Sequence, residues 1–278
     1  LGDVYKRQQM DIGTAKVTEE EKEGIIHHCV DILNPDETYS VHDFQQTVRK
    51  KITEITQRGH VPIIVGGTGL YIKAALYDYQ FDEMENDHHA INEKYKDYTN
   101  EQLHDHLKSI DEESAKILHF NNRRRVLRAI EIYETTGKRK SEMLEEQEHI
   151  CLYDAYFVGL TLPRDVLYER INKRVDVMME NGLKEEMERL YSQGLTRNHQ
   201  SMKAIGYKEW FDYYDHQIDL NDVLELIKKH SRQYAKRQYT WFKNQFDVHW
   251  YDVNLENFEQ TIEQVTDCLL YTSDAADE

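Results

Sequence analysis

The sequence predicts an α/β fold in which a parallel sheet core carries a helical insertion, and two observations support this prediction. In the first and last thirds of the 278-residue chain, short apolar runs that end in turn residues alternate with amphipathic helical patterns. The segment from 82 to 149 is instead charged and helical, with few strand signals. We therefore assign residues 9–81 and 150–268 to an α/β core, and residues 82–149 to a helical insertion.

The first half of the predicted core reads as strand, helix and strand. Residues 27–33 (HHCVDIL) form a short apolar run that ends in an Asn-Pro-Asp turn, so we expect a strand there. Within 41–58, apolar residues recur at spacings of four, four and three, which predicts an amphipathic helix. Residues 61–65 (VPIIV) are a compact β-branched run typical of a buried parallel strand. The three segments together predict a right-handed βαβ unit.

The insertion is expected to be helical because its apolar residues follow helical spacing. Leu103, Leu107 and Ile110 share one face of a predicted helix. Val126, Ile130 and Tyr133 share a face of a second helix, and Gly137 is expected to end it.

The second half of the core begins with a predicted strand at 155–162 (AYFVGLTL). Pro163 then opens a helix that ends at an Asn-Gly pair, because proline is favoured in the first helical turn. A second helix is expected at 183–192, a long helix at about 221–244, and a last strand at 248–253 (VHWYDV).

Composition limits the class of protein. The net charge of −17 taken alone argues against a nucleic-acid partner. The basic residues are, however, clustered between 123 and 140 and between 228 and 243, and local clustering matters more than the sum. No apolar run approaches the ~18 residues of a membrane span. The three scattered cysteines favour a reducing, cytoplasmic compartment and show no zinc-site spacing.

Both ends of the chain lack helical or strand patterning. LGDVYKRQ at 1–8 and LLYTSDAADE at 269–278 resemble translated sequencing adapters. We interpret them as non-native ends and leave them out of the predicted fold. Ordinary frayed termini are the alternative.

A glycine-rich turn is the first candidate for chemistry. Gly66, Gly67 and Thr68 follow the predicted strand at 61–65 and precede a helix, so backbone N–H groups and the Thr68 hydroxyl could face a ligand. A plain strand–helix connection is the alternative. The phosphate-loop pattern GxxxxGK followed by Ser or Thr occurs nowhere in the sequence.

Two basic helical segments are the next candidates. In NRRRVLRA at 122–129, Arg124 and Arg128 lie four residues apart and could offer two guanidinium groups to phosphates. In SRQYAKRQ at 231–238, Arg232 and Lys236 have the same spacing and suit a diphosphate. The alternative for each is a solvated or ion-paired helix face. The segment SMKAIGYKE at 201–209 reads equally well as an RNA-facing loop or a tight connection.

Taken in order, these segments resemble the tRNA dimethylallyltransferases of bacteria, from about residue 9 to about residue 253. Adenylate isopentenyltransferases share parts of the pattern, but the 201–209 and 231–244 segments favour the tRNA enzymes. The matching segments are DIGTAK at 11–16, HHCVDILNPDETYS at 27–40, VPIIVGGTGLYIKA at 61–74, NNRRRVLRAIE at 121–131, INKRVDVMMENGL at 171–183, SMKAIGYKE at 201–209 and SRQYAKRQYTWFKN at 231–244.

The resemblance implies a P-loop-NTPase-like parallel sheet core with a helical insertion that grips the anticodon stem-loop of tRNA. It implies transfer of a dimethylallyl group from dimethylallyl diphosphate to N6 of the adenosine next to the anticodon, with Mg²⁺ as cofactor. It also implies a cytoplasmic enzyme that is a monomer when complete. The implied catalytic residues are Thr68 and Arg232, and the implied diphosphate and channel residues are Gly66, Gly67, Gln233, Lys236 and Arg237. The implied tRNA-binding residues are Thr68, Arg124, Arg125, Val126, Leu127 and Arg128. No role is assigned to Asp11 or Lys16.

The sequence also departs from the family pattern. The family's phosphate loop and its Asp-Ser-x-Gln-x-Tyr segment, whose Asp is the general base, would precede DIGTAK. LGDVYKRQ stands there instead. Ile26 and Phe120 replace prolines and read as tolerable changes. We therefore expect an N-terminally truncated chain that lacks the front strand of its sheet, is poorly soluble and is inactive. A non-catalytic RNA-binding fragment and a P-loop nucleotide kinase are the alternative functions.

Overall fold

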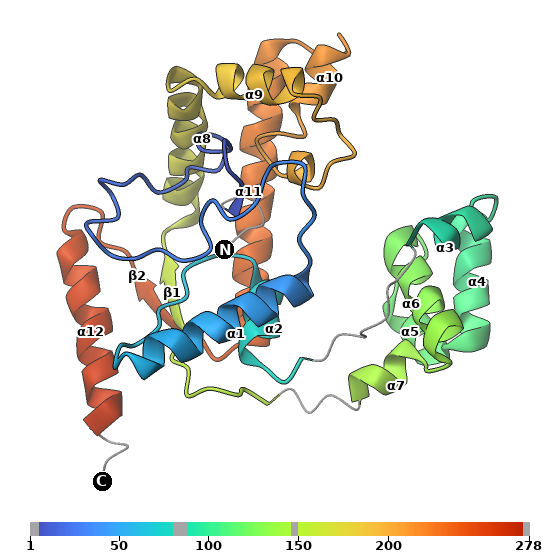
Figure 1. Cartoon of the computed structure of the whole chain (residues 1–278), viewed down its shortest axis with the longest axis horizontal. Helices are drawn as coiled ribbons and strands as arrows, with labels where there is room; N and C mark the ends of the chain where they lie inside the picture. Colours follow the sequence, from blue (N-terminus) through green and yellow to red (C-terminus); the bar gives the residue numbers. More distant parts are fainter. Residues whose placement is uncertain (1–5, 80–87, 146–149, 275–278) are drawn as a thin grey trace. The chain divides into compact units, whose positions relative to one another are not determined.

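The computed structural model describes residues 6–79, 88–145 and 150–274 (Figure 1). The chain divides into two compact units, one formed by Leu1–Ala75 with Asp154–Glu278 and the other by Leu76–Tyr153. The elements of the first unit are α1 (Val41–Gln57), α2 (Gly69–Leu76), β1 (Val158–Thr161), α8 (Arg164–Glu180), α9 (Leu183–Ser192), η2 (Ser201–Lys203), α10 (Trp210–Tyr214), α11 (Leu220–Gln245), β2 (His249–Asp252) and α12 (Phe258–Asp274). Those of the second are α3 (His88–Lys94), α4 (Asn100–Ile110), α5 (Glu112–Ile117), α6 (Arg123–Thr136) and α7 (Lys140–Glu145).

A small parallel sheet is formed by β1 and β2, with Val158 paired to His249 and Thr161 paired to Asp252 (Figure 1). Both strands lie within the segments predicted from the sequence, and their parallel pairing agrees with the predicted sheet type. The described residues are otherwise mostly helical, so the expected wide sheet is reduced here to two strands.

The predicted strand at 27–33 is wrong. Cys29 and Asp31 have φ angles of 63° and 53°, and such left-handed residues interrupt an extended strand. Only Leu33 retains the expected pairing, because its N–H donates to Lys6 O at 2.9 Å and its carbonyl accepts from Gln8 N at 2.8 Å. This is an isolated parallel bridge between Leu33 and Arg7.

The predicted strand at 61–65 is also wrong within the described residues, although its residue types favour one. The segment joins no sheet, and Val61, Ile63 and Val65 are 85%, 82% and 74% exposed. β-branched residues favour strands chiefly because they pack on neighbouring strands, and no such neighbour covers these side chains. The predicted βαβ unit is therefore absent, although its helix is present as α1.

Lys6 and Arg7, which the sequence prediction left outside the fold, are packed inside it. Lys6 and Arg7 are fully buried. The Lys6 ammonium lies 4.2, 4.4 and 4.6 Å from the ring centroids of Tyr39, Phe44 and Tyr71, which are cation–π distances. Residues 1–5 and 275–278 lie outside the described residues, and α12 continues to Asp274.

The first unit is centred on helices α8 to α11, which Figure 1 shows grouped together. The fully buried Trp210 and Tyr207 occupy this core, with Leu183, Leu190 and Met10 packed around them. α8, α9 and α11 follow the predicted boundaries to within one residue, because their apolar spacing was read correctly.

The second unit is a small helical bundle with its own core. Leu103 and Leu107 of α4 pack with Val126 and Ile130 of α6, and all four side chains are fully buried. α6 ends at Gly137, whose φ of 73° is left-handed, as the sequence predicted. None of the helices in the described ranges is long and apolar enough to cross a membrane.

Candidate active site at the Gly66–Gly69 turn

The turn that follows residues 61–65 leads directly into helix α2. The Thr68 carbonyl accepts from the N–H groups of Tyr71 at 3.0 Å and Ile72 at 3.2 Å, which starts the helix. The Thr68 side chain is half-buried rather than hidden. The turn therefore presents a hydroxyl next to a helix N-terminus, as the sequence predicted for this motif.

One face of α11 lies against this turn. Gln238 donates from Nε2 to the carbonyl of Gly67 at 2.9 Å. The hydroxyl of Tyr234 lies 3.3 Å from that of Thr68. Tyr234 and Gln238 are one helical turn apart, so they reach the turn from the same face.

Glycine is required at two positions because α11 approaches so closely. A Cβ added to Gly67 would lie 1.8 Å from Gln238 Nε2, and one added to Gly69 would lie 1.9 Å from the Trp241 ring. A side chain at Gly67 would displace the end of Gln238, and one at Gly69 would press against the rigid Trp241 ring and displace α11. The Gly-Gly-Thr-Gly sequence is thus explained by contact with α11 as well as by any contact with a ligand.

A shallow pocket lies between the turn and α11. Thr68 lines it together with Gly67 and Arg237, so the structure brings together one predicted catalytic residue and two predicted diphosphate or channel residues. The remaining lining residues are Gly69, Leu70, Tyr234, Gln238, Trp241 and Phe242. Aromatic walls with one guanidinium and the hydroxyls of Thr68 and Tyr234 suit a ligand that is apolar at one end and anionic at the other.

Arg232, which the resemblance implied to be catalytic, and the implied diphosphate residues Gly66, Gln233 and Lys236 do not line this pocket. Arg232 donates to the Asn172 side chain on α8, and Lys236 shares its helix row. Gln233 and Lys236 are exposed, as is Gly66 in the turn. The cations of α11 are therefore divided between two faces, and Arg237 is the one that shares the pocket with Thr68.

The predicted RNA-facing arginines lie on α6 in the second unit. Arg124 and Arg125 are exposed, and no ion pair of either side chain occurs within the described residues. Arg128 instead binds the buried Glu131 at 2.8 Å, the salt-bridge alternative considered from the sequence. Arg123 donates to the carbonyls of Tyr95 and Tyr98, so it holds α6 in the bundle.

Val126 and Leu127 require a correction. The resemblance placed them among the tRNA-binding residues, but their side chains are 0% and 5% exposed. They pack in the core of the helical unit because the apolar face of α6 must be covered. Their contribution is to hold Arg124 and Arg125 on the outer face.

Lys140, at the start of α7, adds a further cation beside α6. Burial lowers the pKa of its ammonium, and the charges of Arg125 and Arg128 lower this pKa further. The start of α7 is fixed by Asp111, which accepts from Ser141 N at 3.0 Å and from Ser141 Oγ at 2.7 Å. Like charges kept this close form a surface suited to an anionic partner.

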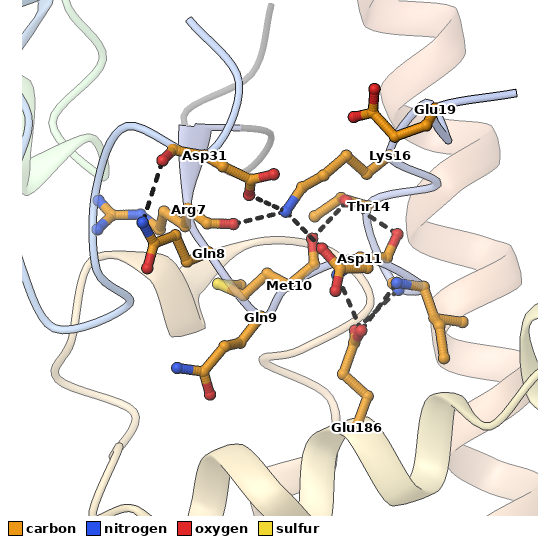
Figure 2. A network of polar contacts seen from close by, with 12 residues as sticks. Arg7, Gln8, Gln9, Met10, Asp11, Thr14, Lys16, Glu19, Asp31 and Glu186 are labelled. Atoms are coloured by element: carbon orange, nitrogen blue, oxygen red, sulfur yellow. Dashed lines mark hydrogen bonds and ion pairs between the residues drawn. The ribbon is translucent and has the colours of Figure 1, made fainter. Parts of the chain in front are cut away.

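A polar network around residues 10–16 was not predicted, and it gives Asp11 and Lys16 a structural role (Figure 2). Glu186, buried on α9, accepts from the N–H groups of Asp11, Ile12 and Gly13 at 2.8, 2.8 and 3.0 Å. Lys16 lies between the carboxylates of Asp11 and Asp31, each at 2.5 Å. The DIGTAK segment is therefore held by its own charges and by α9.

The open question about residues 201–209 is answered by the same network. The Tyr207 hydroxyl donates to Glu186 at 2.7 Å, and Tyr207 is fully buried. A Cβ on Gly13 would lie 2.7 Å from the Tyr207 ring, and Gly206 has a φ of 96°. The segment is a tight connection locked against residues 10–14, because only glycine permits this approach.

Magnesium was expected from the resemblance, and the residues described here do not supply a protein site for it. No carboxylate lines the pocket, and the described residues contain no group of three or more His, Cys, Asp or Glu side chains that could hold a metal ion. Mg²⁺ prefers carboxylate and phosphate oxygens. No catalytic step is therefore routed through a metal held by these side chains.

Comparison with known proteins agrees with this arrangement. A family model described as IPP transferase matches residues 3–245. The tRNA dimethylallyltransferase of Bacillus cereus strain AH187 is 52% identical over 247 residues, which cover 88% of this chain and 78% of that protein. The enzyme of the same name from Bacillus anthracis has the same identity and coverage.

Solved structures give the same result. The crystal structure of a tRNA delta(2)-isopentenylpyrophosphate transferase from Staphylococcus epidermidis matches with a TM-score of 0.70 and 44% identity, over 98% of this chain and 89% of that one. A eukaryotic dimethylallyltransferase acting on tRNA matches with a TM-score of 0.81 and 28% identity, over 95% and 69%. The small parallel sheet and the helices are thus those of a prenyltransferase that modifies tRNA. The chain belongs to the IPP transferase family.

Proposed function

We propose that the chain takes part in transfer of a dimethylallyl group from dimethylallyl diphosphate to N6 of the adenosine next to the anticodon of tRNA. The observation that carries this proposal is the pocket between the Gly66–Gly69 turn and α11, because it combines aromatic walls with Thr68 and Arg237. The aromatic side chains suit the prenyl group, and the guanidinium suits the departing diphosphate.

In this proposal the adenosine leaves the stacked anticodon loop and reaches the Thr68 hydroxyl, a form of base flipping. Arg237 lies at the same pocket and stabilises the negative charge that develops on the diphosphate as its bond to the prenyl carbon breaks. Arg232, Gln233 and Lys236 would extend the cationic surface along the exposed part of α11.

We propose that residues 82–149, within the second unit, bind the anticodon stem-loop. Arg124 and Arg125 support this, because both are exposed and no ion pair of either occurs within the described residues. Lys140 would join them at the phosphates. The enzyme would meet its tRNA in the cytoplasm.

The test incubates the full chain with Mg²⁺, isotopically labelled dimethylallyl diphosphate and unmodified tRNA. Label on the adenosine next to the anticodon supports the proposal and overturns the sequence-based expectation of inactivity. Salt-dependent tRNA binding without transfer of the label supports the proposed tRNA binding and agrees with the expectation of an inactive chain. The absence of both tRNA binding and label transfer would contradict the proposal.

A further inference from the structure

A hydrogen bond between the buried Glu209 and the half-buried His230 links the 201–209 segment to α11, and the reaction proposed above makes no use of it. Glu209 is 3% exposed. Its Oε1 lies 2.7 Å from Nδ1 of His230 on α11, and its Oε2 accepts from the N–H of Gly206 at 2.9 Å. Because a carboxylate only accepts, His230 donates from Nδ1.

The two oxygens of Glu209 therefore hold two different segments at once. Gly206 is fixed in turn by its left-handed φ of 96° and by the 3.2 Å approach that a Cβ there would make to Gly13 O. A buried carboxylate is costly unless its oxygens are satisfied, so displacing either partner is unfavourable. The pair fixes His230 relative to a rigid part of the core.

His230 lies on the same face of α11 as the residues that contact the active-site turn. Tyr234 and Gln238 follow it at intervals of four residues, and α-helical side chains at this spacing align. Tyr234 approaches Thr68, and Gln238 donates to Gly67. His230 is thus one helical turn before Tyr234, the first of the two residues that contact the active-site turn.

From this geometry we infer that Glu209 and His230 are positioning residues, which set the rotation and axial position of α11 over the Gly66–Gly69 turn. They touch neither the turn nor the pocket, and they act through Tyr234, Arg237 and Gln238. A helix that rotates or slides by a fraction of a turn would separate Arg237 from Thr68. The effect on ligand binding rests on the proposed function, whereas the positioning of α11 over the turn does not depend on it.

The test compares three variants of the full chain. His230→Leu removes the donor, whereas His230→Asn keeps an N–H near the position of Nδ1. Lys229→Leu is the matched control, because it makes an equally apolar change at the neighbouring exposed residue, on another face of α11. Hydrogen exchange is followed at the amides of Tyr71 and Ile72, which are bonded to Thr68 O, and at those of α9.

We expect His230→Leu to raise exchange at Tyr71 and Ile72 by about tenfold, as for loss of one hydrogen bond to a charged group. α9 should be unchanged, and His230→Asn should restore most of the protection. Wild-type exchange at these two amides in His230→Leu would overturn the inference. An equal rise in α9, or no rescue by His230→Asn, would show a general loss of stability and would overturn it as well.

Titration with dimethylallyl diphosphate provides the second readout. His230→Leu should bind it about tenfold more weakly than Lys229→Leu, because Arg237 is displaced, and His230→Asn should bind it nearly as tightly as the wild type. Equal affinity in all variants would overturn the effect on the site. If the wild-type chain binds no dimethylallyl diphosphate, the proposed function fails here, while the exchange result still decides the positioning role.

Discussion

At the scale of single residues, two glycines decide how closely α11 meets the active-site turn. Gly67 faces the flexible end of Gln238, whereas Gly69 faces the rigid ring of Trp241. The two positions therefore differ in what must move when a methyl group is added. This difference allows a test of how tightly the site is built.

We expect Gly67→Ala to cost about 1 kcal/mol of folding free energy, because Gln238 swings aside and its hydrogen bond to the Gly67 carbonyl is lost. Gly69→Ala should cost more, about 1–3 kcal/mol, because the Trp241 ring cannot bend away and α11 must shift. Urea unfolding of both variants measures this difference. Equal stability of the two variants and the wild type would contradict the contacts described.

Which residues would lie together could be predicted from the sequence only where the segments carry a motif. Thr68 and Arg237 were identified from a motif, and the structure places both at one pocket. Glu186 was missed, because its partners lie more than 170 positions away in the chain. Nothing in the spacing of an amphipathic helix such as α9 distinguishes a buried carboxylate from a solvated one.

At the scale of elements, Asp111 connects three helices of the second unit. It follows α4, accepts from Ser114 N at the start of α5, and accepts from Ser141 in α7. Asp111 is buried, with an exposed fraction of only 1%. Burial raises the pKa of this carboxyl group, but the hydrogen bonds from Ser114 and Ser141 outweigh burial, so its pKa is lowered overall.

We expect Asp111→Asn to destabilise the second unit by about 1–3 kcal/mol at neutral pH, because an amide N–H₂ cannot accept from Ser141. Since the folded pKa lies below the unfolded one, the stabilisation is complete above about pH 5 and is lost as the pH falls through the folded value. The difference between wild type and variant should therefore shrink in acid. Circular dichroism across this pH range measures it, and a constant difference would contradict the assignment.

Helices were predicted more successfully than strands, for a physical reason. The period of an amphipathic helix is recorded in its own residues, so α1, α8, α9 and α11 could be placed from sequence alone. A strand also depends on partners elsewhere in the chain. Residues 61–65 have strand-forming side chains but join no sheet in the described structure, and left-handed residues interrupt 27–33.

At the scale of the whole molecule, Val61 and Ile63 form part of an exposed apolar segment that resembles an unprotected strand edge. We expect the chain to associate with itself through this segment, and Val61→Lys with Ile63→Lys to reduce the association. Sedimentation at several concentrations measures it. Ile117→Lys is the control, because Ile117 is a similarly exposed apolar residue on α5.

If the double variant associates as strongly as the wild type, the segment is not the site of self-association. If Ile117→Lys is equally effective, added charge alone explains the effect.

We propose that this chain recognises the adenosine next to the anticodon of tRNA, and binding to an unmodified anticodon stem-loop measures that recognition. We expect saturable binding that weakens steeply with salt and loosens when that adenosine is replaced by another base. We also expect Arg125→Gln to weaken binding more than Arg139→Gln, because Arg139 is paired with Glu142. Equal binding of both stem-loops, or no binding at low salt, would contradict the claim.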